Sequence, residues 1–154
     1  MDIQWTGLRT VSRQLQAASE SVVPTVGASL FQEAETILTL SKTDYVPVDT
    51  GALRASGFVE PPIIASSQVS VTLGFGGPAA PYAVIVHEDL TKRHTVGQAK
   101  YLEVPLKARL QGMPAVLAFR AQEAIRQSIQ RLANVERNVL AGRDVNWGQP
   151  LFAP

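Results

Sequence analysis

The sequence predicts an α+β fold, in which long N-terminal and C-terminal helices pack against a small antiparallel sheet. The hydrophobic period changes along the chain from 3.6 residues to 2 and back again. The chain has 154 residues, of which 45% are apolar and 18% charged, so it can bury one core. The charged fraction lies below the roughly 25% of an ordinary soluble domain, which favours coverage of the surface by partner subunits.

The N-terminal region predicts helix because apolar residues recur at spacings of three and four. These residues are Leu8, Val11, Leu15, Ala18, Val22, Leu30, Ala34, Ile37 and Leu38. Pro24 interrupts the pattern because it lacks an N–H group. The region therefore forms either two helices, 4–22 and 25–42, or one long helix kinked at Pro24. Pro47 ends it and pushes Val46 toward extended geometry.

The central region predicts two strands, over 58–65 and 68–75, with a tight turn at Ser66-Ser67. Residues 82–88 are apolar and fit either a strand or a short helix. Residues 61–87 contain no Asp, Glu, Lys or Arg. Prolines and glycines divide this stretch, however, and no apolar run reaches the ~18 residues of a membrane-spanning helix. We therefore expect no membrane partner.

The last long helix is predicted from the apolar series Leu102, Leu106, Leu110, Met113, Leu117, Ala121, Ala124, Ile129 and Leu132. Pro105 suits its first turn, and Gly112 with Pro114 predicts a kink or break. The expected organisation is a single domain over 1–133 followed by an extended arm over 134–154. Trp147, Leu151 and Phe152 are the expected anchors of this arm on another chain, and folding back on its own subunit is the alternative.

The sequence contains few candidate catalytic residues. The chain has no Cys, which excludes disulfides, thiol catalysis and Cys-ligated zinc. His87, Glu88 and His94 could serve a metal-dependent hydrolase, although their spacing fits no His-Glu-x-x-His motif. Arginines along the last helix could serve a non-specific nucleic-acid-binding module, but glutamates are mixed among them. No cofactor is expected.

Three segments carry a resemblance to a known family. Residues 47–56 read Pro-Val-Asp-Thr-Gly-Ala-Leu-Arg-Ala-Ser, residues 81–88 contain Pro-Tyr-Ala and then His-Glu, and residues 97–106 read Gly-Gln-Ala-Lys-Tyr-Leu-Glu-Val-Pro-Leu. In this order they resemble the tail-completion, neck, head–tail joining or minor capsid proteins of tailed bacteriophages. The match covers about residues 30–132.

The resemblance implies a structural virion protein with no catalytic activity. Such a protein forms a ring of identical subunits in the phage neck, hexameric to match a tail tube or else dodecameric. Its expected partners are a head connector or portal-side protein, a tail terminator or tail tube protein, and genomic DNA in transit. The expected location is the virion, after assembly in the host cytoplasm.

The motif residues expected to shape the fold are Asp49, Thr50, Gly51, Leu53, Arg54, Pro81, Tyr82, Glu88, Lys100, Tyr101, Leu102 and Pro105. Asp49 or Thr50 is predicted to cap a short helix, with Gly51 supplying a sharp turn. Tyr82 is predicted to be an aromatic anchor. These are signals for folding rather than for positioning a nucleophile beside a base.

Overall fold

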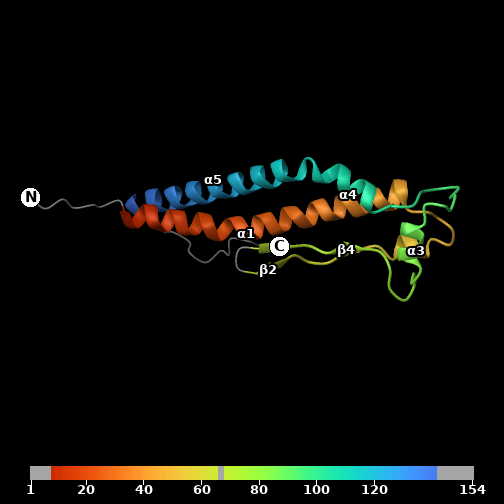
Figure 1. Cartoon of the computed structure of the whole chain (residues 1–154). Coiled ribbons are helices and arrows are strands. Elements are labelled where there is room, and N and C mark those ends of the chain that lie inside the picture. Colours follow the sequence, from red (N-terminus) through yellow and green to blue (C-terminus); the bar gives the residue numbers. More distant parts are fainter. Residues whose placement is uncertain (1–7, 66–67, 142–154) are drawn as a thin grey trace, which may run out of the picture. The chain divides into compact units, whose positions relative to one another are not determined.

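The computed structural model describes residues 8–65 and 68–141 (Figure 1). Its elements are long helices and short antiparallel strands, which confirms the α+β class. The chain divides into two compact units, one of Met1–Val22 with Gln122–Pro154 and the other of Val23–Ala121. No helix in the described ranges is long and apolar enough to cross a membrane.

Helix α1 spans Leu8–Leu40 and passes through Pro24 without ending. The alternative of a single long helix is therefore confirmed, and that of two separate helices is wrong. Regular hydrogen bonds on both sides hold the turn that Pro24 weakens, since helix formation is cooperative. A π-helical turn, η1 (Ser41–Tyr45), follows, and Val46 is extended at φ −66° and ψ 124°, as Pro47 predicts.

The strands form a narrow ribbon in two parts. β1 (Phe58–Val59) pairs with β4 (Leu73–Gly74), and β2 (Ile63–Ala65) pairs with β3 (Gln68–Ser70), both antiparallel. Each predicted strand is thus split. Pro61 and Pro62 explain the gap in the first strand, because neither can donate a backbone hydrogen bond to a partner strand.

Two glycines bring this ribbon close to the first helical region. A Cβ placed on Gly27 would lie 3.5 Å from Val69 Cγ1 and 3.6 Å from Pro62 Cβ. A Cβ on Gly57 would lie only 2.9 Å from Leu38 Cδ1. The ribbon therefore runs along the side of α1 between these two points of close approach.

Two short helices complete the central region. α2 spans Ala52–Ala55, and α3 spans Ala83–Glu88, which settles the ambiguous segment as a helix. Gly51, rather than Asp49 or Thr50, occupies the N-cap of α2, at φ +85°. Thr50 Oγ1 accepts only a long hydrogen bond, 3.4 Å, from the Ala52 N–H. Thr50 thus makes the predicted side-chain bond to a free N–H of α2, although from one residue before the N-cap, and the positive φ of Gly51 confirms the predicted sharp turn.

The last helical region breaks where the sequence predicts. α4 spans Glu103–Leu110 and α5 spans Met113–Leu140, with Gly112 in the interruption. The Arg109 guanidinium joins α4 to α1 by donating to Glu33 Oε2 from Nη2 at 2.5 Å and from Nε at 3.1 Å. Glu33 is almost fully buried, so this pair satisfies a carboxylate that would otherwise be costly to bury.

The predicted extended arm is wrong over 134–140, because α5 continues to Leu140. These residues contain no Gly or Pro, and the next helix-breaking residue is Gly142. Trp147, Leu151 and Phe152 lie outside the described residues. In the unit that contains this end of α5, Ser128 Oγ donates to Ser21 Oγ at 2.8 Å. A single domain over 1–133 stays a prediction.

Gly51 offers a test of backbone strain alone, because a Cβ there would meet no atom within 4 Å. We predict that Gly51→Ala lowers the free energy of unfolding by about 1 kcal/mol, since only the left-handed backbone resists the change. Gly112→Ala is the matched control, because its Cβ also meets open space and its φ is not positive. Equal denaturation midpoints for the two variants would contradict the turn.

Candidate functional site

Tyr101 is the centre of the main core. Its side chain is 1% exposed, and its hydroxyl donates to the Ala83 carbonyl at 2.8 Å. The ring meets Phe75 edge-on at a centroid distance of 5.2 Å and His87 at 4.8 Å. Burial raises the pKa of the Tyr101 hydroxyl to about 12. This residue is therefore a neutral structural anchor at physiological pH.

All three motif segments contribute to this core. Leu53 comes from 47–56, Ala83 from 81–88 and Tyr101 from 97–106, and they form one buried cluster with Val46 and Ala80. Leu102 packs against the cluster, and Pro105 is fully buried in the first turn of α4. Segments separated by up to fifty residues thus build a common packing unit.

Other motif residues point outward. Asp49, Thr50, Arg54 and Pro81 are exposed, and Tyr82 is 39% exposed at the N-cap of α3. The anchoring role predicted for Tyr82 therefore belongs to Tyr101. The exposed members are available for contacts with other molecules, while the buried members hold the fold.

The segment before Tyr101 is fixed by its backbone. The Gln98 N–H donates to the Tyr45 carbonyl and the Lys100 N–H to the His87 carbonyl, both at 2.8 Å. Gly97 has φ +80°, and a Cβ there would lie 2.5 Å from Pro47 N. Only glycine combines this left-handed backbone with so close an approach. Gly97 was not among the predicted fold-shaping residues, although its place at the head of the third segment was a usable signal.

Ser41 is a second residue that the sequence analysis missed. It is fully buried, and its Oγ donates to the Tyr101 carbonyl at 2.7 Å. This bond fixes the end of the first helical region to the third motif segment. The available signal was a polar residue that continues the apolar helical spacing of Ile37 and Leu38.

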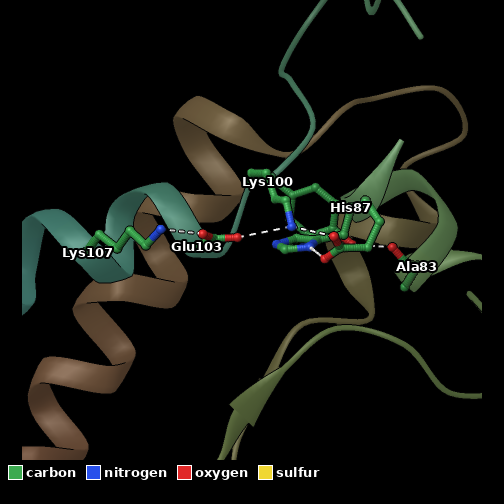
Figure 2. A network of polar contacts seen from close by, with 7 residues as sticks. Ala83, His87, Lys100, Glu103 and Lys107 are labelled. Atoms are coloured by element: carbon green, nitrogen blue, oxygen red, sulfur yellow. Dashed lines mark hydrogen bonds and ion pairs between the residues drawn. The ribbon is translucent and has the colours of Figure 1, made fainter. Parts of the chain in front are cut away.

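A network of charges covers one side of this core (Figure 2). Lys100 Nζ pairs with Glu88 and, at 3.1 Å, with Glu103, which also accepts from Lys107 Nζ at 2.5 Å. Glu88 Oε1 contacts His87 Nδ1 at 2.7 Å. Lys100 has φ +57°, a strained conformation for a residue with a side chain. The network thus meets a strained backbone turn at Lys100.

The carboxylates of the network titrate below their usual range. Hydrogen bonds from Lys107 and then Lys100 lower the pKa of Glu103 to about 2. Hydrogen bonds from Lys100, and to a smaller extent from His87, lower the pKa of Glu88. Hydrogen bonds to Glu88, and to a smaller extent to Glu103, raise the pKa of Lys100. Because the folded carboxylates have lowered pKa values, their stabilisation is present above about pH 4.5 and is lost as the pH falls further.

The proposed hydrolase residues are not assembled as a metal site. Within the described ranges, no three His, Asp or Glu side chains form a group suited to a metal ion. Glu88 is instead paired with an ammonium group, which competes with a cation for the same oxygens. His94 lines a separate cavity of about 450 Å³ with Lys92, Arg93, Asp49 and Thr50. This cavity mixes both charges and holds no hydrogen-bonded pair of nucleophile and base.

Comparisons with family models, with curated proteins and with solved structures found no match.

Tyr101→Phe removes the hydroxyl but keeps the ring. We predict a loss of about 1 kcal/mol in the free energy of unfolding, the usual contribution of one hydrogen bond. Tyr82→Phe is the control, since Tyr82 is 39% exposed and its hydroxyl makes no hydrogen bond in the described part of the chain. Urea denaturation measures both, and a Tyr101→Phe variant as stable as Tyr82→Phe would contradict the anchor.

Lys100→Met tests the charge network. We predict that the pKa values of both Glu88 and Glu103 rise toward 4.5, the ordinary value for glutamate. Lys107→Met serves as the comparison and raises the pKa of Glu103 alone, because Lys107 does not contact Glu88. Carboxyl-detected NMR titration separates the two residues. A Glu88 pKa that is unchanged in Lys100→Met would be inconsistent with the network, because His87 alone would then account for the lowered value.

Proposed function

We propose that this protein is a structural component of a tailed-phage neck, where a ring of identical subunits completes the tail and joins it to the head connector. One observation carries the proposal: the three motif segments that resemble this family meet in a single core around Tyr101. Shared motifs that form a core specify a fold. The resemblance is then of the kind expected between proteins with a common architecture, and the neck role is our proposal from that resemblance.

The surface supports an assembling protein. Large apolar side chains are exposed on several elements of the central unit, including Ile63, Val84, Ile85, Leu90 and Phe119. Clusters of exposed apolar side chains mark surfaces that contact other molecules. A subunit embedded in a ring, with one neighbour above and one below, would cover such surfaces.

The alternative functions receive less support. A metal-dependent hydrolase would need His87, Glu88 and His94 to act together, whereas Glu88 is committed to Lys100 and His87. A nucleic-acid-binding helix would need a basic face, whereas glutamates are mixed with the arginines of α5 and Glu123 is paired with Arg126. Both arrangements fit a helix or loop at a protein surface.

The proposal includes a set of partners and a location. The subunits form a hexamer or a dodecamer, with a head connector or portal-side protein on one side and a tail terminator or tail tube protein on the other. Genomic DNA passes transiently through the ring. The protein is made in the host cytoplasm and remains in the virion.

Disruption of the gene in the phage that carries it tests the proposal. We predict that the mutant accumulates filled heads and separate tails under the electron microscope, and that wild-type protein supplied from a plasmid restores joined particles. Antibody labelling should place the protein at the head–tail junction. Normal infectious particles without the protein would overturn the proposal, and stoichiometric zinc or manganese in the purified protein would favour the hydrolase.

A further inference from the structure

The exposed side of α3 carries a concentrated apolar surface. Val84 is 70% exposed, Ile85 62% and Leu90 74%, and Tyr82 at the start of the helix is partly exposed. We call these four residues the α3 patch. The remaining apolar residues of the helix, Ala83 and Val86, face the core. The outward residues therefore contribute nothing to the core and are available to a partner.

The rim of the α3 patch carries both charges, with Lys92 and Arg93 beside Asp49 and Asp89, and Arg93 is its free cation among the described residues. Lys92 and Arg93 follow Leu90 closely and line the cavity of about 450 Å³ together with Tyr82 and Val86. Among the described residues no carboxylate pairs with Arg93, and Lys92 lies 3.8 Å from Asp89. The partner of the α3 patch should therefore present apolar side chains beside an acidic group.

The strand ribbon of this same chain presents such a surface. Pro61, Ile63 and Ala65 alternate along the chain and are all exposed, and we call them the hairpin patch. Glu60 directly precedes them, is exposed, and is the only Asp, Glu, Lys or Arg between residues 55 and 91 apart from Glu88 and Asp89. No ion pair of Glu60 occurs in the described part of the chain. The hairpin patch is thus apolar with one unmatched negative charge.

The two patches occupy different places along α1. The hairpin approaches α1 at Gly27, whereas the core beneath α3 is tied to Ser41 through Tyr101. At about 1.5 Å per helical residue, positions 27 and 41 are roughly 21 Å apart. Complementary surfaces at separate places on one subunit generate head-to-tail contacts, which form a ring when the rotation closes.

We infer that the α3 patch of one copy binds the hairpin patch of the next copy, with Glu60 meeting Lys92 and Arg93. This inference rests on the proposed function in that the repeated contact would build the proposed ring. The contact itself involves only this chain. It can therefore be measured on purified protein without a phage.

Paired cysteines test the contact, because the chain has no Cys of its own. Ile63→Cys and Ile85→Cys variants are treated with a short bismaleimide, separately and mixed. We predict a cross-linked dimer only in the mixture, and a ladder of oligomers when one chain carries both substitutions. The size of the largest closed species reports the ring. Absence of the mixed dimer, or an equally strong Ile85→Cys dimer with itself, would overturn the inference.

A matched control and a charge exchange sharpen the result. Phe119→Cys replaces a side chain that is 61% exposed and lies outside both patches, so it should not cross-link to Ile63→Cys. Arg93→Glu or Glu60→Arg should each lower the yield about tenfold, and combining them should restore it. Failure of the combined variant to recover would contradict the assigned pairing. Circular dichroism confirms that each variant is folded.

The outcomes separate this inference from the proposed function. A head-to-tail ladder from a protein that is absent from virions would sustain the contact and reject the neck role. A protein that is found in virions but gives no ladder would sustain the neck role and reject the contact. Full-length protein with Trp147, Leu151 and Phe152 changed to Ala should retain the ladder. Loss of the ladder would instead indicate that the α3 patch binds the C-terminal segment of a neighbour. That result would overturn the pairing of the α3 patch with the hairpin patch.

Discussion

Burial of the Tyr101 ring is the constraint on which the central unit depends. Its hydroxyl is satisfied by the Ala83 carbonyl, and its own carbonyl is satisfied by Ser41. A buried polar group without a partner would cost more than the bond itself contributes. The position of α3 and the end of the first helical region must therefore be correct together, which links three distant parts of the chain.

This arrangement requires an unusual backbone on the approach to Tyr101. Gly97 and Lys100 both have positive φ, at +80° and +57°. Glycine adopts this conformation freely, whereas lysine does so at a cost of about 1–2 kcal/mol. The ion pairs of Lys100 with Glu88 and Glu103 stabilise the same turn. The charged network thus lies at the same turn as the strained backbone of Lys100.

The sequence was informative where a local pattern determines the structure. Pro47 predicted extended Val46, Gly112 and Pro114 predicted the break before α5, and Gly51 predicted a positive φ. Long-range contacts were not predictable in this way. Nothing local distinguishes Tyr101 from Tyr82 as the buried ring, because burial depends on which segments meet in space. The sequence predicted an arm over 134–140 because the apolar spacing weakens there. The residues themselves still favour a helix, and the helix continues through them.

A core of this kind should open as one unit. The amides of Gln98 and Lys100 donate to the carbonyls of Tyr45 and His87, and the Ala83 amide donates to the nearby Ala80 carbonyl. We expect all three bonds to depend on the seated Tyr101 ring. Native-state hydrogen exchange measured by NMR tests this directly. The account predicts one common opening free energy for the three amides. Exchange of Gln98 and Lys100 at a much lower free energy than Ala83 would contradict it, because the third motif segment would then be a loose loop rather than part of the core.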